Sequence, residues 1–191
     1  MIQNVFFTPI FAHNFSGIAL NKIQDEIDKV LPDVRSKENA SPWGDAVTTT
    51  FNFEKVNDVE TYKLDIFKEA VGWAIKEYAR EINYPNPIFK MSESWFNFCK
   101  KGGFQYDHSH PRSRISGVYY YQSNGDDGKI RFQNPNPNIN FSYFPADGTD
   151  IDAVSYRPAV GRLLLFPSWL SHRVNINTTD HERISIAFNL E

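Results

Sequence analysis

Tyr106-Asp107-His108-Ser109-His110-Pro111 stands just before the most strand-like run of the chain, Ile115-Ser116-Gly117-Val118-Tyr119-Tyr120-Tyr121. Side chains of a strand alternate between its two faces, so residues i and i+2 point the same way. His108 and His110 can therefore reach toward one point, and neutral imidazole is a common ligand of zinc, iron, copper and nickel. A metal held by this pair needs a further ligand, and the candidate is His172, which opens a later predicted strand.

The composition fits a globular protein that binds neither nucleic acid nor a membrane. The length of 191 residues suits one domain spanning 1–191, and 41% hydrophobic residues are enough to bury a core. The 20 basic and 23 acidic residues nearly balance without a basic block, so we expect no nucleic-acid partner. The lone cysteine, Cys99, excludes an internal disulfide and a Cys-based zinc site.

No apolar run reaches the ~18 residues of a membrane-spanning helix. The N-terminus lacks the basic-then-apolar order of a signal peptide. We therefore expect a cytoplasmic protein, or one of the host cytoplasm if the chain is encoded by a phage.

Two helices are predicted to precede a series of closely spaced strands. The first helix covers 16–31 and ends at Pro32, and the second covers about 57–82 and begins with a capping-box spacing of Asn57 and Glu60. Strands are expected at 2–12 (an edge strand), 47–53, 94–99, 115–122, 129–133, 160–166, 172–177 and 183–190. A turn at 124–128 is predicted to join two of them as a hairpin, and 134–150 is expected to be a surface loop.

This order predicts a mainly β fold with α-helices, a sandwich or barrel whose helical support (about 14–83) packs on one outer face of a core at about 88–191. The last strand alternates strictly between Ile184, Ile186, Phe188 and Leu190 on one face and Arg183, Ser185, Ala187 and Asn189 on the other. The polar face either meets water or lines a cavity, and alternation alone leaves both open.

The metal hypothesis suggests a role for the polar face of the last strand. If the strands at 172–177 and 183–190 are antiparallel neighbours, Arg183 lies deeper in a cavity than His172. Its guanidinium offers a planar, permanently charged fork for a carboxylate, and Ser185 adds a hydroxyl on the same face. A buried arginine without a partner would be costly, so a small dicarboxylate could supply the missing charge.

From about Ser94 to Leu190 the sequence resembles the 2-oxoglutarate- and iron(II)-dependent oxygenases, in particular a bacterial and phage group of their prolyl-hydroxylase-like branch. The motifs that carry the resemblance are His108-Ser109-His110, Ser116-Gly117-Val118-Tyr119-Tyr120, Gly161-Arg162-Leu163-Leu164-Leu165-Phe166-Pro167-Ser168, His172 and Arg183-Ile184-Ser185. The resemblance implies a double-stranded β-helix (a jelly roll, as in cupins) with the N-terminal helices packed on one sheet.

The resemblance also implies a site and a reaction. Fe(II) would be held by His108, His110 and His172, and 2-oxoglutarate would be bound by Arg183 and Ser185. Tyr120 is either a further contact of 2-oxoglutarate or a core aromatic residue, and Asn97 is either a further contact or a hydrogen-bonded interior residue. The expected reaction is hydroxylation of a small molecule or a protein side chain, with release of succinate and carbon dioxide.

The sequence departs from the family pattern at one position. His110 stands where most relatives have a carboxylate, and Asp107 or a water molecule is the alternative occupant of that coordination site. Asp107 is expected to point to the opposite strand face unless a bulge turns it.

Two other functions stay open. One is a cupin-like three-histidine dioxygenase that does not use 2-oxoglutarate, which the Arg-x-Ser strand argues against. The other is a non-catalytic jelly-roll binding or phage structural module.

Overall fold

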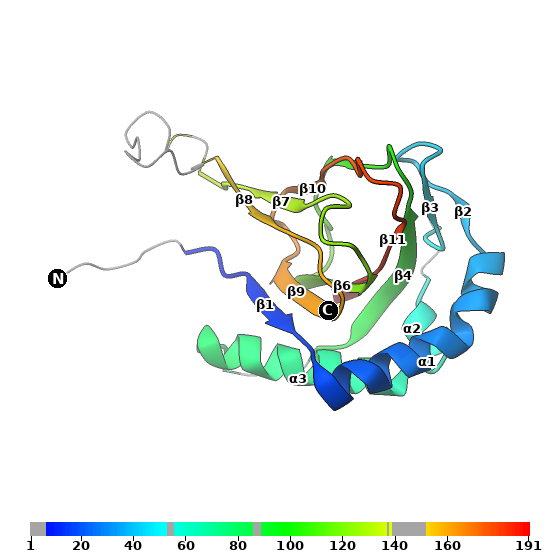
Figure 1. Cartoon of the computed structure of the whole chain (residues 1–191). Coiled ribbons are helices and arrows are strands. Elements are labelled where there is room, and N and C mark those ends of the chain that lie inside the picture. The colour runs from blue at the N-terminus through cyan, green and yellow to red at the C-terminus, as the bar shows by residue number, and fades with distance from the viewer. Residues whose placement is uncertain (1–6, 53–55, 86–88, 137, 139–151) are drawn as a thin grey trace.

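The computed structural model of the chain describes residues 7–52, 56–85, 89–136, 138 and 152–191. Figure 1 shows the helices gathered on one side of the strands. In chain order the elements are β1 (Phe11–Asn14), α1 (Gly17–Ser36), β2 (Asn39–Ala40), β3 (Val47–Thr49), α2 (Asp58–Thr61), α3 (Asp65–Glu81), β4 (Met91–Cys99), β5 (Gln105–His108), β6 (Ile115–Gln122), β7 (Ile130–Gln133), β8 (Ala153–Tyr156), β9 (Arg162–Pro167), β10 (His172–Val174) and β11 (Arg183–Leu190).

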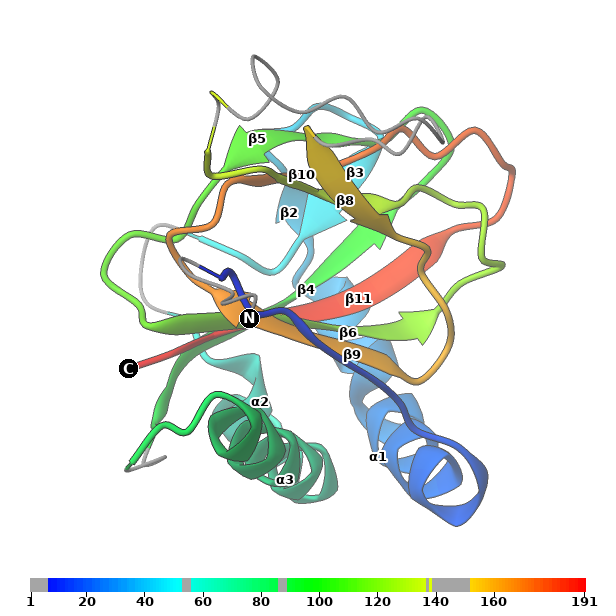
Figure 2. The same cartoon turned by 90° about the vertical axis from the view of Figure 1, so that its left-hand side faces the viewer.

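Two antiparallel sheets form the body of the molecule. The larger has seven strands in the order β1-β9-β6-β11-β4-β3-β2, and the smaller has four in the order β5-β10-β7-β8. Helices α1 and α3 lie on the outer face of the large sheet, and the small sheet lies over its other face (Figure 2). This arrangement confirms the predicted mainly β fold of the double-stranded β-helix type, with helices on one sheet.

The last strand, β11, has buried residues on both of its faces. Ile184, Ile186 and Phe188 are at most 1% exposed and pack in the core beneath the helices. Burying each such side chain stabilises the fold by roughly 1.5–3 kcal/mol. On the opposite face Arg183 and Ser185 are also buried, at 3% and 5% exposed. The polar face therefore lines the space between the sheets rather than meeting water.

The first helix does not end at Pro32, as the sequence predicted, but continues to Ser36. A proline inside a helix removes one backbone hydrogen bond. The turn beyond it regains contacts, because Val34 is fully buried and the Arg35 guanidinium lies 4.5 Å from the centre of the Phe98 ring and pairs with Glu182. Packing against the sheet thus outweighs the local effect of the proline.

The single helix expected at 57–82 is two helices, α2 and α3. Asn57 caps α2 as predicted, its side-chain oxygen accepting from the Glu60 amide at 3.3 Å. The chain then turns at Lys63, which has φ of 53°. The carboxylate of Glu26 in α1 accepts hydrogen bonds from the Ile66 and Phe67 amides in the first turn of α3, at 2.9 Å each. This cap from another helix stabilises the N-terminus of α3 as a separate helix.

The predicted hairpin between 115–122 and 129–133 is wrong in its pairing. Both strands exist, but β6 pairs with β9 and β11 of the large sheet, whereas β7 pairs with β8 and β10 of the small sheet. The turn between them crosses from one sheet to the other around the buried Asp127 carboxylate, which accepts from Ser123 Oγ and the Asn124 amide at 2.8 Å.

The premise that the strands carrying His172 and Arg183 are neighbours is also wrong, because β10 belongs to the small sheet and β11 to the large one.

The first strand lies at the sheet edge as expected but spans 11–14 rather than 2–12, and 1–6 lie outside the described residues. Most of the loop expected at 134–150 also lies outside them. The short strands β2 and β8 were not predicted. In the described ranges no helix is long and apolar enough to cross a bilayer.

Candidate metal centre

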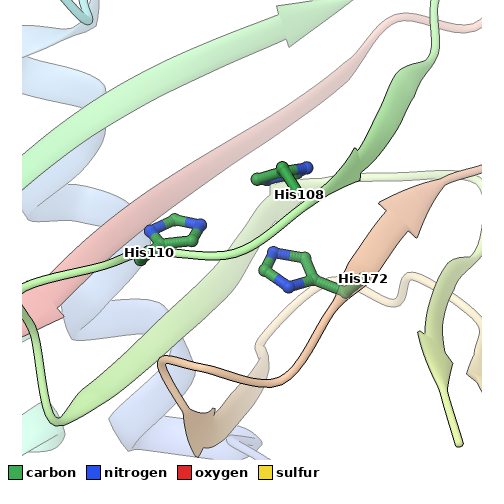
Figure 3. Close-up of side chains that lie close together, drawn as sticks. All are labelled: His108, His110 and His172. Atoms are coloured by element: carbon green, nitrogen blue, oxygen red, sulfur yellow. The ribbon is translucent and has the colours of Figure 1, made fainter. Parts of the chain in front are cut away.

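Three histidines from two strands and one loop converge between the sheets. His108 ends β5, His110 follows in the loop, and His172 opens β10 directly opposite His108 in the strand register. One ring nitrogen from each lies within 4.8 Å of those of the other two. Figure 3 shows the rings gathered around one common space. His110 is thus brought in by the loop, not by strand alternation.

The outer nitrogen of each ring has an oxygen partner. His108 Nδ1 lies 2.7 Å from the Tyr106 carbonyl, and His172 Nδ1 lies 2.9 Å from the Leu170 carbonyl. A carbonyl can only accept, so Nδ1 carries the proton in both rings. This leaves the lone pair on Nε2, the nitrogen that can bind a metal.

His110 is held by a side chain of β11. Its Nδ1 lies 2.8 Å from Asn189 Oδ1, and Asn189 Nδ2 donates to Glu93 Oε2 at 2.8 Å. The Glu93 carboxylate accepts only, so it sets the orientation of the Asn189 amide, which in turn makes His110 Nδ1 the donor. The Ser116 hydroxyl, 2.8 Å from Asn189 Oδ1, supports the same amide from β6.

The environment keeps these imidazoles neutral. Burial lowers the pKa of His172 to about 3 and that of His110 to about 4, and the neighbouring His108 ring contributes to both shifts. Burial also lowers the pKa of His108. Neutral rings are the form that binds a metal, and a proton on one ring would disfavour protonation of its neighbours.

The residues present fit a divalent metal ion. His110 Nε2 is buried and has no hydrogen-bond partner in the described part of the chain, which leaves a polar atom that a metal would satisfy. Three nitrogens at about 2.1 Å from one ion can lie at most about 4.2 Å apart. The separations of the three ring nitrogens, all within 4.8 Å, are close to that limit.

The histidines open into a cavity of about 350 Å³ between the sheets. Among its described lining residues, Arg183 is the one lysine or arginine. Its Nη1 donates to the carbonyls of Asp127 and Gly128 at 2.6 and 2.9 Å, and it has no carboxylate partner within the described ranges. Gly128 permits this approach, since a Cβ there would lie 2.7 Å from Arg183 Nη1. A buried guanidinium held only by neutral groups is suited to an anionic ligand.

The other predicted cofactor contacts line the same cavity. Ser185 pairs in register with Asn97 on one side and Tyr120 on the other, so the three lie in a row across β4, β11 and β6. Burial raises the pKa of Tyr120 to about 12, so its hydroxyl remains a donor. Asn97 Oδ1 accepts from Thr49 at 3.0 Å.

Asp107, the alternative ligand, is not in the cluster. Its carboxylate accepts from Gln133 Nε2 at 2.8 Å and lies 3.6 Å from Arg173, on the far side of the strand. Trp95 lines the cavity, whereas Trp169 is 58% exposed and does not.

Residues 93–189, just over half of the chain, match the family described as "Putative 2OG-Fe(II) oxygenase". The matched segment runs from β4 to β11 and contains the three histidines and Arg183. The chain belongs to this family of oxygenases. Its cofactors are Fe(II) and 2-oxoglutarate, and the substrate is not identified by the match.

Solved structures share the fold of this oxygenase at low sequence identity. A prolyl-4-hydroxylase from Pseudomonas putida is 17% identical, with 96% of this chain and 91% of that chain covered and a TM-score of 0.57. HygX from Streptomyces hygroscopicus, solved with nickel and 2-oxoglutarate, is 11% identical (96% and 82% covered, TM-score 0.60). A prolyl hydroxylase from Trichoplax adhaerens, in complex with a hypoxia-inducible-factor peptide fragment, is 12% identical (94% and 83% covered, TM-score 0.60). A search of curated proteins found no match.

The residues around the ligands were missed by sequence reasoning. Asn189 was placed on the polar face of the last strand without a role, and Glu93, Ser116 and Trp43 were given none. Alternation on β4 places Glu93 on the face of Trp95 and Asn97, so a signal for it existed. Its partnership with Asn189 is a contact between residues 96 positions apart.

Proposed function

We propose that the oxygenase hydroxylates its substrate at this cavity, with His108, His110 and His172 binding Fe(II) and Arg183 and Ser185 binding the far carboxylate of 2-oxoglutarate. One observation carries the proposal. The Nε2 atoms of the three histidines face a shared space at one cavity. The same cavity is lined by the buried guanidinium of Arg183, which has no carboxylate partner in the described residues. A diacid that reaches from the metal to Arg183 would satisfy both.

When bound, iron(II) with 2-oxoglutarate and dioxygen supplies the oxidation, in which the co-substrate becomes succinate and carbon dioxide and a C–H bond of the substrate gains oxygen. The residues of the chain orient the cofactors and shield the reaction from water. The oxygen acceptors on each Nδ1 hold the rings in position, and the Asp127 and Gly128 carbonyls hold Arg183 toward the cavity. The protonated Tyr120 hydroxyl is a further donor for a carboxylate.

We infer a small molecule or a protein side chain as the substrate. The cavity has room for the co-substrate and for one substrate group beside it. The solved structures with the same fold include one with a peptide, and one with hygromycin B. Fold alone does not choose between such substrates.

Succinate release is the direct test. We expect the purified protein with Fe(II) and 2-oxoglutarate to form succinate slowly without added substrate and faster with one drawn from peptide and metabolite pools. His172→Ala should reduce succinate to background. Arg183→Met should raise the 2-oxoglutarate concentration for half-maximal rate roughly 10- to 100-fold, because a charge-assisted hydrogen bond contributes about 1.5–3 kcal/mol.

Arg173→Met is the matched control, since Arg173 lies beside Asp107 on the outer face of β10 and does not line the cavity. It should leave the 2-oxoglutarate requirement unchanged. Oxygen uptake without succinate would instead indicate a cupin-like three-histidine dioxygenase. Failure to bind a metal at all would indicate a non-catalytic module.

A further inference from the structure

Glu93 is the one aspartate or glutamate among the described residues that line the cavity. It lies on β4 directly opposite Asn189 of β11, and its Oε2 accepts from Asn189 Nδ2 at 2.8 Å. No cation pairs with it in the described part of the chain, and that amide is its one hydrogen-bond partner there. One carboxylate oxygen is thus left for a ligand.

Glu93 lies beside the metal centre and away from Arg183. Its partner Asn189 is bonded to His110, whereas Arg183 lies six positions earlier on the same strand, opposite Cys99. Residues i and i+6 of a strand are about 20 Å apart. If Arg183 binds the co-substrate, the charge that the protein presents to the remaining space is the negative charge of Glu93.

Aromatic rings line the cavity around the three histidines. The Trp95 ring is stacked on His110 with centroids 5.8 Å apart, and Phe51 packs against Trp95 at 5.2 Å. Trp43 lies against His108 at 5.0 Å. The faces of such rings attract cations, by about 0.5–1 kcal/mol at exposed sites and about 2 kcal/mol when water is excluded.

The charge of the ligand decides whether this environment favours binding. A neutral group that filled the space would strip water from Glu93 without offering a counter-charge, which is costly. An anion would be repelled. A cation would pair with the carboxylate and contact the aromatic faces at the same time.

We propose that the oxygenase takes a substrate with an organic cation, an amine, guanidinium or quaternary ammonium group, held by Glu93 and the rings of Trp95, Phe51 and Trp43. This rests on the proposed function only in that Arg183, and not Glu93, binds the co-substrate. A free amine metabolite and a lysine side chain of a protein share the required chemistry.

Paired probes that differ only in charge test the proposal. Choline is compared with 3,3-dimethyl-1-butanol, and Nα-acetyl-lysine N-methylamide with its norleucine analogue, by ligand-observed NMR titration of the full chain with Zn(II) and 2-oxoglutarate, and again without either. We expect at least one cation to bind about tenfold more tightly than its neutral partner, which is the size expected of one ion pair with an aromatic contact. The better cation indicates the metabolite or the side-chain source.

Glu93→Gln should abolish the difference within each pair, because glutamine retains an oxygen that accepts from Asn189 but carries no charge. Glu69→Gln removes the same charge from the exposed face of α3 and should leave the difference intact. Equal binding of cation and neutral partner, or a preference that survives Glu93→Gln, would overturn the proposal. The titration without metal does not depend on turnover, so a protein that forms no succinate can still pass or fail this test.

Discussion

At the scale of single residues, the candidate metal centre depends on the hydrogen-bond acceptors of the histidines as much as on the histidines themselves. Each Nδ1 has its own oxygen acceptor, and that acceptor sets which nitrogen is free for a metal. His110 differs from the other two because its acceptor is a side chain, Asn189, itself oriented by Glu93. This arrangement holds the His110 imidazole close to the other two rings.

Asn189→Ala should therefore weaken metal binding. The His110 ring would lose the acceptor that orients it, and loss of such a supporting partner typically lowers metal affinity about 10- to 100-fold. Equilibrium titration with Co(II), followed by its absorption spectrum, measures the change. Asn21→Ala, on the exposed side of α1, is the control and should leave the affinity unchanged. An unaltered Co(II) affinity in Asn189→Ala would show that His110 needs no such support.

At the scale of elements, the central strands β6 and β11 fit together through a glycine. Gly117 lies opposite Phe188 in the register, and a Cβ added at Gly117 would lie 2.2 Å from the Phe188 ring. The phenylalanine ring thus occupies the space that any other residue would need. The Ser-Gly-Val-Tyr-Tyr motif is therefore also a packing requirement of the sheet that carries Asn189 and Arg183.

Gly117→Ala should destabilise the fold by about 1–3 kcal/mol or more, the usual range for overpacking a dense core. Gly72→Ala is a contrasting control, because a Cβ at Gly72 of α3 meets nothing within 4 Å. Alanine there should stabilise the helix by up to about 1 kcal/mol. Urea unfolding of both variants measures the difference, and equal stabilities would contradict the close fit of Gly117 to Phe188.

At the scale of the whole molecule, the site is made by two sheets that face each other. The large sheet supplies Arg183, Ser185 and Glu93, whereas the small sheet supplies His108 and His172. His110 lies in the loop that leads from the small sheet to the large one. A metal ion would therefore join the small sheet to the chain segment that crosses between the layers.

Metal binding should stabilise the protein and slow hydrogen exchange where the ligands lie. At a metal concentration of 100 Kd the gain is about 2.7 kcal/mol, provided the unfolded chain does not bind. We expect slower amide exchange in β5, β10 and the loop of His110 on adding Zn(II), with little change in α3. His172→Ala should show neither effect. Protection spread evenly over the molecule would argue against a local link between the sheets.

The residue types, and the strand faces on which they lie, follow from the amino-acid sequence alone. The alternation of 183–190 and the extent of 115–122 were predicted as they stand in β11 and β6, because a strand's alternation is a local property. The histidines, Arg183, Ser185 and Tyr120 were named from motifs, and Asn97 was named from its place in a predicted strand. The structure brings all of them to one cavity. Their individual roles stay predictions that the experiments above test.

Strand pairing, the ends of the helices and the groups that support each histidine depend on contacts between distant parts of the chain. The turn at 124–128 has the composition of a hairpin, yet it crosses between sheets around buried Asp127. The first helix passes Pro32 because its last turn packs on the sheet. Glu93, Asn189 and His110 meet although they are far apart in sequence. Such outcomes depend on the free energy of contacts between distant residues, which local propensities do not contain.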